Sequence, residues 1–233
     1  MSRAGATPAV VSLTLAEQLR GNVRVGTLSA APVAVAAAAA DLEREIECQA
    51  STLRERYSGR APADVGDLAA ARELYRAFGI DPTKTRPSSE KLLRRVLREL
   101  PLPRISNAVD LANLVALRLL LPVGLYDAAK IEGRVELRPG REGEGYTGTA
   151  GQQVHLAGRP LLTDQRGPFG NPTADSLRTA VEPATRALWL TVFAPASLPS
   201  VSLETGLRAA AAAFTRHLSG PGGPVIVTTG IVD

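Results

Sequence analysis

The chain has 233 residues, of which 45% are hydrophobic and only 4% aromatic, so it can bury a sizeable core built mainly from Leu, Val and Ala, as one large domain or two small ones. No apolar run reaches the ~18 to 20 residues of a membrane span, and the first residues show no secretory signal. The single cysteine, Cys48, excludes an intrachain disulfide. We therefore expect a cytoplasmic protein with no membrane partner. The formal net charge of +4 and the pI of about 9.6 permit a polyanionic partner.

The first 85 residues are predicted to form short strands followed by helices. Two segments alternate branched and polar side chains, as strands do: 9–14 and 22–28. Residues 32–57, which begin with an Ala-rich run, have the apolar spacing of an amphipathic helix. A second helix is predicted over 68–79, ending at Gly79. We expect residues 1–85 to pack as a cover on the same unit as the rest of the chain.

Two further helices are predicted next. The first starts at Pro87 and carries three Arg residues, and the second, over 106–121, is apolar on most sides and is predicted to be buried at the centre. Asp110 and Asn113 interrupt its apolar surface one turn apart, so their side chains project to the same side. An unpaired buried polar group costs about 1 to 3 kcal/mol. The two side chains therefore either hold a neighbouring loop, such as that of Tyr126 and Asp127, or bind a ligand in a pocket.

After Pro122 the apolar period changes towards two, which predicts a meandering sheet. Strands are predicted at 123–127, 133–139, 143–148, 160–164 and 187–195, the last being the clearest buried strand. An amphipathic helix follows, and the β-prone tail within 221–233 could pair with a sheet edge or with a partner. Without repeated βαβ units, the pattern favours an α+β fold with a mixed or antiparallel sheet over a doubly wound one.

Metal, cofactor and nucleophile motifs are absent from the sequence. His155 and His217 are isolated, and neither lies in a zinc-ligand spacing. The Gly-rich segment 140–151 lacks the GxxxxGK[ST] pattern of a phosphate loop and is interpreted as a hairpin turn. We expect no metal and no cofactor.

The segment GPFGNPTADSLRTAV, residues 167–181, raises a question about its role. Its Gly, Pro and Asn residues predict an irregular loop. Four polar residues then follow closely: Asp175, Ser176, Arg178 and Thr179. Arg178 suits a carboxylate or phosphate, and Asp175 suits an ammonium group or a water molecule. The spacing alone leaves open whether these side chains line a pocket or hold the loop.

An ordered series of motifs resembles the stand-alone relatives of the B3/4 domain, the editing domain of the bacterial phenylalanyl-tRNA synthetase β chain. The similar segments run from about Glu73 to Pro195 and are ELYRAFGIDPTKTRPSSE, VDLANLV, LPVGLYD, the KIEG strand pattern and SLRTAVEPATRALWLTVFAP. The resemblance implies a B3/4-like domain over about 86–220, with a buried central helix and flanking N-terminal helices.

The resemblance also implies hydrolysis of an aminoacyl-tRNA ester in trans, with tRNA as the partner and not DNA. A positioned water and oxyanion donors can perform this reaction without a metal or a covalent nucleophile. On this basis Asn113 and Asp175 are expected to be catalytic, Asn113 orienting the water or ester and Asp175 holding the α-ammonium group. The expected substrate contacts are Asp110, Gly124, Tyr126, Asp127, Ser176, Arg178 and Thr179.

The chain departs from the synthetase pattern at two places. Gly124 falls where the synthetase domain carries a histidine, and Gly170, Asn171 and Pro172 align with its Gly-Gly-Glu. The resemblance therefore does not imply the synthetase domain's specificity for tRNA wrongly charged with tyrosine. Two alternatives stay open: a binding module on the same fold that performs no hydrolysis, and a hydrolase of small aminoacyl esters.

Overall fold

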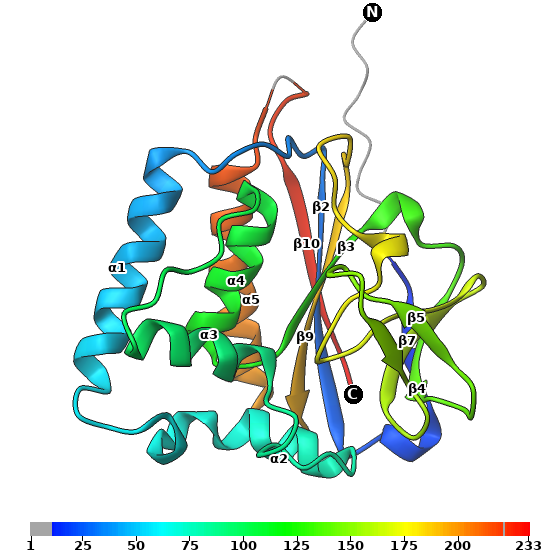
Figure 1. Cartoon of the computed structure of the whole chain (residues 1–233). Coiled ribbons are helices and arrows are strands. Elements are labelled where there is room, and N and C mark those ends of the chain that lie inside the picture. Colours follow the sequence, from blue (N-terminus) through cyan, green and yellow to red (C-terminus); the bar gives the residue numbers. More distant parts are fainter. Residues whose placement is uncertain (1–10, 221) are drawn as a thin grey trace, which may run out of the picture.

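A four-stranded antiparallel sheet forms the centre of the computed structural model, which describes residues 11–220 and 222–233 (Figure 1). The strand order is β10-β2-β9-β3. The strands are β2 (Val23–Ala31), β3 (Val123–Asp127), β9 (Leu188–Pro195) and β10 (Ile226–Val232). β10 and β3 thus lie at the two ends of the strand order.

A second sheet of four strands, in the order β1-β4-β7-β8, packs on one side of the central sheet. Its β1·β4 pair is parallel and its other pairs are antiparallel. The strands are β1 (Leu13–Leu15), β4 (Val135–Pro139), β7 (Pro160–Asp164) and β8 (Gly167–Gly170), and a separate hairpin joins β5 (Gly145–Thr147) to β6 (Gln153–His155).

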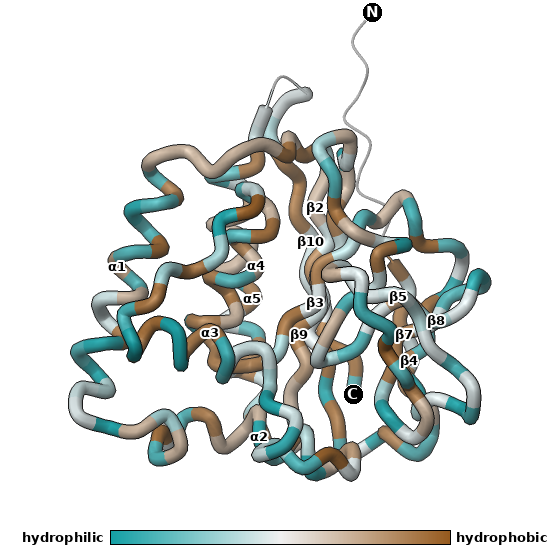
Figure 2. The backbone as a smooth tube through the Cα atoms, in the orientation of Figure 1, coloured by the Kyte–Doolittle hydropathy of each residue, from teal (hydrophilic) through white to brown (hydrophobic). Residues whose placement is uncertain are grey.

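Helices cover the other side of the central sheet, as Figure 1 shows for α1, α3, α4 and α5. Figure 2 shows teal and brown turns alternating along the outer helix α1, as expected for a helix with one buried face. The helices are α1 (Ala40–Arg56), α2 (Ala69–Ala77), α3 (Ser88–Leu97), α4 (Asn107–Leu119) and α5 (Ser200–His217). The α+β class and the buried central helix, α4, are confirmed.

Strand β9 divides the core into two parts. Leu190 and Val192 point towards the helices, whereas Trp189 and Phe193 point into the space between the two sheets. Because side chains alternate along a strand, a fully buried strand supplies both cores. The face that carries Trp189 also carries the candidate site described below.

The predicted helix over 32–57 is correct only from Ala40 onwards, and residues 32–39 are not helical. Their backbone is held by tertiary hydrogen bonds: the Asn107 side chain accepts from Ala36 N at 3.0 Å and donates to Ala34 O at 2.8 Å. Val33 N donates to Arg186 O at 2.9 Å. These long-range bonds override the helix propensity of the Ala-rich run.

Two expectations for the strands are wrong. Residues 167–170 form strand β8 and not a loop. The strand lies at the edge of its sheet, where Pro168 is tolerated although it has no N–H group to donate. The predicted meander is split as well, because β3 pairs with β9 in the central sheet and β4 belongs to the second sheet.

The tail pairs with β2 of the same chain, so of the two predicted partners it takes the sheet edge. Predicted strand 9–14 lies partly outside the described residues, and β1 covers only its end. The N-terminal strands are integral to both sheets, since β1 pairs with β4 and β2 with β9. Within 11–220 and 222–233, no helix is long and apolar enough to cross a membrane, and His, Cys, Asp and Glu form no group of three able to hold a metal ion.

Candidate functional site

The side chains of Tyr126 and Asp175 meet at the open edge of β3. Tyr126 Oη donates to Asp175 Oδ1 at 2.7 Å, and Leu125 N donates to Asp175 Oδ2 at 3.3 Å. β3 pairs with β9 on its other edge. Asp175 therefore accepts a backbone hydrogen bond where a further strand would otherwise pair.

Asp175 is held in a state that suits proton transfer. The residue keeps partial exposure, but its carboxyl group is turned inwards against the buried Tyr126. Burial raises the pKa of Asp175 to about 7, although the hydrogen bonds from Tyr126 and Leu125 oppose this shift. Acid and base forms of the carboxyl group therefore coexist near neutral pH, as general acid–base chemistry requires.

The loop that carries Asp175 is fixed by three side chains that are not among the predicted site residues. The bonds come from Asn171 (accepting from Thr173 N at 2.7 Å and Ala174 N at 2.9 Å), Tyr146 (donating to Ala174 O at 2.5 Å) and Tyr75 (donating to Pro172 O at 2.9 Å). The Asn-Pro-Thr run is typical of a turn in which an Asn side chain bonds the backbone two residues on. Only this local part could have been found from the sequence.

Tyr126 fills the space between two glycines. A Cβ atom at Gly124 or at Gly170 would overlap the Tyr126 hydroxyl. The phenol ring is fixed by Phe169 in an edge-to-face contact at 5.1 Å and by Trp189 at 5.6 Å. The missing side chains at Gly124 and Gly170 thus make room for a tyrosine of the chain itself.

Two buried polar atoms of β9 lie on the same face of the strand. Trp189 Nε1 and Thr191 Oγ1 are buried and have no hydrogen-bond partner among the described residues. Trp189 stands opposite Tyr126 across the strands, and Thr191 stands opposite Gly124. Both atoms therefore lie in the interior that Trp189 shares with Tyr126.

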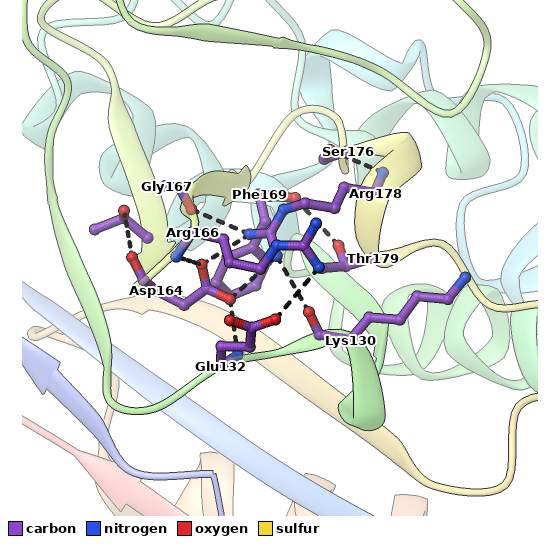
Figure 3. Close-up of polar contacts among 10 residues, drawn as sticks. Lys130, Glu132, Asp164, Arg166, Gly167, Phe169, Ser176, Arg178 and Thr179 are labelled. Atoms are coloured by element: carbon purple, nitrogen blue, oxygen red, sulfur yellow. Dashed lines mark hydrogen bonds and ion pairs between the residues drawn. The ribbon is translucent and has the colours of Figure 1, made fainter.

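Arg178 is bound within the protein, as Figure 3 shows. Its guanidinium group contacts both carboxylate oxygens of Asp164, at 2.9 and 3.2 Å, and donates to Lys130 O and Gly167 O at 3.1 Å. It also lies over the Phe169 ring at 5.5 Å. These contacts hold the segment after β8 against β7. Asp164, the partner that makes this possible, was not selected from the sequence.

Three other predicted contact residues also make structural bonds. Ser176 Oγ accepts from Arg178 N at 3.1 Å, at the start of the short 3-10 helix Leu177–Thr179. Thr179 is fully buried, and its hydroxyl donates to Phe169 O at 3.5 Å. Asp127 accepts from Ala129 N at 3.0 Å and from Thr185 Oγ1 at 2.7 Å. All three side chains hold the chain segments around the Tyr126–Asp175 pair.

The two polar residues of α4 differ in their surroundings. Asp110 is buried and accepts from Ile105 N at 3.0 Å, so it holds the segment that leads into α4. Burial raises the pKa of Asp110, and the hydrogen bond from Ile105 opposes this shift. Asn113 is half-buried, and its side chain makes no hydrogen bond within the described part of the chain. Its role stays a prediction.

A family model described as the B3/4 domain matches residues 70–218, more than half of the chain. The chain belongs to the B3/4 domain family. The matched range starts in α2 and ends just after α5, so it includes the Tyr126–Asp175 pair and every predicted site residue.

This B3/4 domain is similar to two curated phenylalanine–tRNA ligase beta subunits. It is 38% identical to that of Streptomyces avermitilis over 93 residues, 40% of this chain and 11% of the relative, and 35% identical to that of Paramagnetospirillum magneticum over 81 residues, 34% of this chain and 10% of the relative. The chain thus spans about a tenth of each relative. A crystal structure of an N-terminal fragment of the phenylalanyl-tRNA synthetase beta subunit from Pyrococcus horikoshii aligns with a TM-score of 0.47 and 12% identity, covering 97% of this chain and 53% of that one.

The position of Tyr126 predicts the effect of adding a methyl group at Gly124 of this B3/4 domain. In Gly124→Ala the new Cβ would overlap the Tyr126 hydroxyl and lie 2.9 Å from Thr191 Oγ1, so the buried Tyr126 side chain must move. Overpacking of this kind costs about 1 to 3 kcal/mol. Urea unfolding measures the loss, and Gly66→Ala is the control because a Cβ there meets nothing within 4 Å. Equal stability of Gly124→Ala and the wild type would show that Tyr126 does not fill this space.

Proposed function

We propose that this B3/4 domain hydrolyses the ester bond of an aminoacyl-tRNA in trans. The observation that carries the proposal is the carboxyl group of Asp175, held at the open edge of β3 with a pKa near neutral. The resemblance to an editing domain and the similarity to phenylalanine–tRNA ligase beta subunits supply the substrate class. The formal net charge of the chain, +4, is compatible with a tRNA partner.

In this mechanism the ionised form of Asp175 takes a proton from a water molecule as the water oxygen attacks the ester carbonyl carbon. The bond between that carbon and the ribose oxygen then breaks, and Asp175 returns the proton to the ribose oxygen. General acid–base catalysis of this kind contributes roughly 10² to 10⁴ in rate. Tyr126 and Leu125 hold the carboxyl group in position throughout.

The edge of β3 offers a donor for the oxyanion. Leu125 N points away from β9, towards Asp175, and alternate residues of an antiparallel strand direct their N–H groups to the same side. Val123 N therefore points to the same side and can donate to a developing oxyanion. This assigns Asp175 the role of base, in place of the ammonium-binding role expected from the sequence, and leaves Asn113 as a proposed orienting group for the ester.

The filled space between Gly124 and Gly170 favours a second candidate function. Tyr126 occupies this space, so a ligand group has no room between Gly124 and Gly170. A module that binds tRNA, an amino acid or a protein without hydrolysis would need no space there. The two candidate functions differ in whether the protein hydrolyses the aminoacyl ester.

A panel of tRNAs, each charged with a different amino acid, tests the proposal. We expect at least one ester to disappear faster with the protein than in buffer, and free aminoacyl esters to be cleaved more slowly than the matching aminoacyl-tRNA. If every ester survives as long as in buffer, the module without hydrolysis is correct. If free esters are cleaved as fast as aminoacyl-tRNA, the substrate is a small ester and tRNA is not recognised.

A further inference from the structure

A hollow on the surface lies along α3 and is lined mostly by cationic side chains. It has a volume of about 440 Å³, and we call it the α3 groove; it is lined by Lys84, Thr85, Arg86, Lys91, Arg94, Arg95, Arg98 and Leu100. Six of the eight lining residues are Lys or Arg, and none is acidic. The hydrophilic turns of α3 appear in teal in Figure 2. Neither the core nor the Tyr126–Asp175 pair uses these side chains.

The positive charge of the α3 groove is only slightly offset from within the protein. Glu90 lies behind the groove with a side chain only 5% exposed, and pairs with Arg72 at 3.0 Å and with Arg86 and Arg94 at 3.9 and 4.0 Å. One buried carboxylate thus forms ion pairs with three guanidinium groups. Lys91 and Arg98 are exposed and make no ion pair within the described part of the chain.

The basic surface continues beyond the α3 groove. A neighbouring hollow of about 230 Å³ shares Arg86 and Arg94 with it and adds two more guanidinium groups, Arg72 and Arg76. Arg presents a planar fork of donors that matches phosphate oxygens in two-point contacts. No aromatic side chain lines either hollow, so stacking on unpaired bases is not available there. The lining therefore fits a phosphodiester backbone read without regard to base sequence.

The N-terminal end of α3 lies against the loop that carries Asp175. Ser88, the first residue of α3, donates to Pro172 O at 3.5 Å, and Tyr75 of α2 bonds the same carbonyl at 2.9 Å. From Ser88 the helix rises about 15 Å to Arg98, at about 1.5 Å per residue. A polyanion that lies in the α3 groove therefore has one end beside the Asp175 loop.

We propose that the α3 groove binds the phosphodiester backbone of tRNA and so directs the aminoacylated 3′ end to the Asp175 loop. This inference rests on the proposed function for its partner. The groove is concave and can hold a phosphodiester strand, and its Arg-rich lining supplies the complementary charge.

Binding of tRNA by a double variant, Lys91→Gln/Arg98→Gln, tests the proposal. Both side chains are exposed and unpaired, so their replacement leaves the fold intact. The control, Arg44→Gln/Arg208→Gln, also removes two exposed helical cations, but from α1 and α5, where Arg208 pairs with Glu204 at 3.9 Å. We expect the groove variant to bind tRNA roughly tenfold or more weakly, with the slope of log affinity against log salt reduced by about one per lost phosphate contact. The control is expected to retain wild-type affinity.

The outcomes separate the groove from the proposed hydrolysis. A groove variant with a raised KM for aminoacyl-tRNA and an unchanged rate at saturation supports the proposal. RNA binding that depends on the groove without any loss of ester supports the groove but overturns the hydrolysis. Equal tRNA binding by the wild type, the groove variant and the control overturns the proposal that the α3 groove binds tRNA. Hydrolysis is then judged on its own assay. Groove-dependent binding to phosphatidylserine vesicles without binding to tRNA also overturns the proposal for the α3 groove.

Discussion

The Asp175→Asn variant is expected to lose activity and to gain stability at neutral and alkaline pH. Loss of the proposed general base should lower the rate of ester hydrolysis by roughly 10² or more. The gain in stability arises because burial raises the pKa of Asp175 from 3.8 to about 7. The folded protein therefore keeps, between these two pKa values, a proton that the unfolded chain has released, and above the higher one it carries a buried charge.

The sign of the pH effect follows from proton binding. Between pH of about 4 and about 7 the folded state binds more protons than the unfolded state, so the free energy of unfolding falls as pH rises. Above about 7 the cost of the buried charge is complete and amounts to at most about 4 kcal/mol. Asparagine cannot ionise. The variant should therefore match the wild type near pH 4 and exceed its stability at pH 8, as measured by urea unfolding.

Two further variants make this result specific. In Tyr126→Phe the hydroxyl that lowers the pKa of Asp175 is removed, so the acid limb of the pH–rate profile should move to higher pH. In Asp164→Asn a carboxylate paired with Arg178 is removed, and stability should fall instead of rise. If Asp175→Asn is less stable than the wild type at pH 8 and keeps full activity, Asp175 holds the loop and is not the base.

The expected gain in stability would show that ionised Asp175 destabilises the fold. A carboxyl group that serves only to hold a loop is most stabilising when it is ionised and paired with a cation, as Asp164 is. Asp175 has neutral donors instead, one hydroxyl and one backbone N–H. A buried carboxyl group without a cation costs stability, and such costs are concentrated at functional sites.

The sequence predicts local elements well where their apolar period is uninterrupted. The buried strand at 187–195 and the helix at 106–121 appear as β9 and α4, because both are buried over most of their surface. The Ala-rich residues 32–39 were predicted wrongly, since their conformation depends on Asn107, which lies about 70 residues further along the chain. A one-dimensional period contains no information about such a partner.

The candidate site was predictable only in part for the same reason. The segment LPVGLYD, which contains β3, and Asp175 come together through the bond between Tyr126 and Asp175. The polar spacing after Asp175 did not distinguish a ligand contact from a structural bond. Ser176 bonds a backbone N–H two residues away, a local pattern common for serine, whereas the partner of Arg178 is Asp164, at the end of strand β7. Only the fold reveals which polar side chains already have partners.

The Arg178→Met variant is expected to lose about 3 kcal/mol of stability. The side chain of Asp164 is completely buried, and without Arg178 its carboxylate would be left without a cation. Breaking one partner of a buried ion pair costs about 3 to 5 kcal/mol. The backbone N–H groups of Glu132 and Arg166, each at 2.9 Å from the carboxylate, compensate in part and place the loss at the low end. Methionine keeps most of the side-chain volume over Phe169, and urea unfolding measures the effect.

A double-mutant cycle with Asp164→Asn separates the ion pair from packing. In Asp164→Asn/Arg178→Met no buried charge is left unpaired, so the double variant should be more stable than the sum of the single losses predicts. The stability of Arg178→Lys should lie between those of the wild type and Arg178→Met, because a single ammonium group cannot make the two-point contact with Asp164. The opposite pattern, wild-type stability in Arg178→Met with weaker tRNA binding, would show that Arg178 leaves Asp164 to contact the substrate, as the sequence suggested. Because all four acceptors around the guanidinium group belong to the protein, the loss is expected in stability and not in binding.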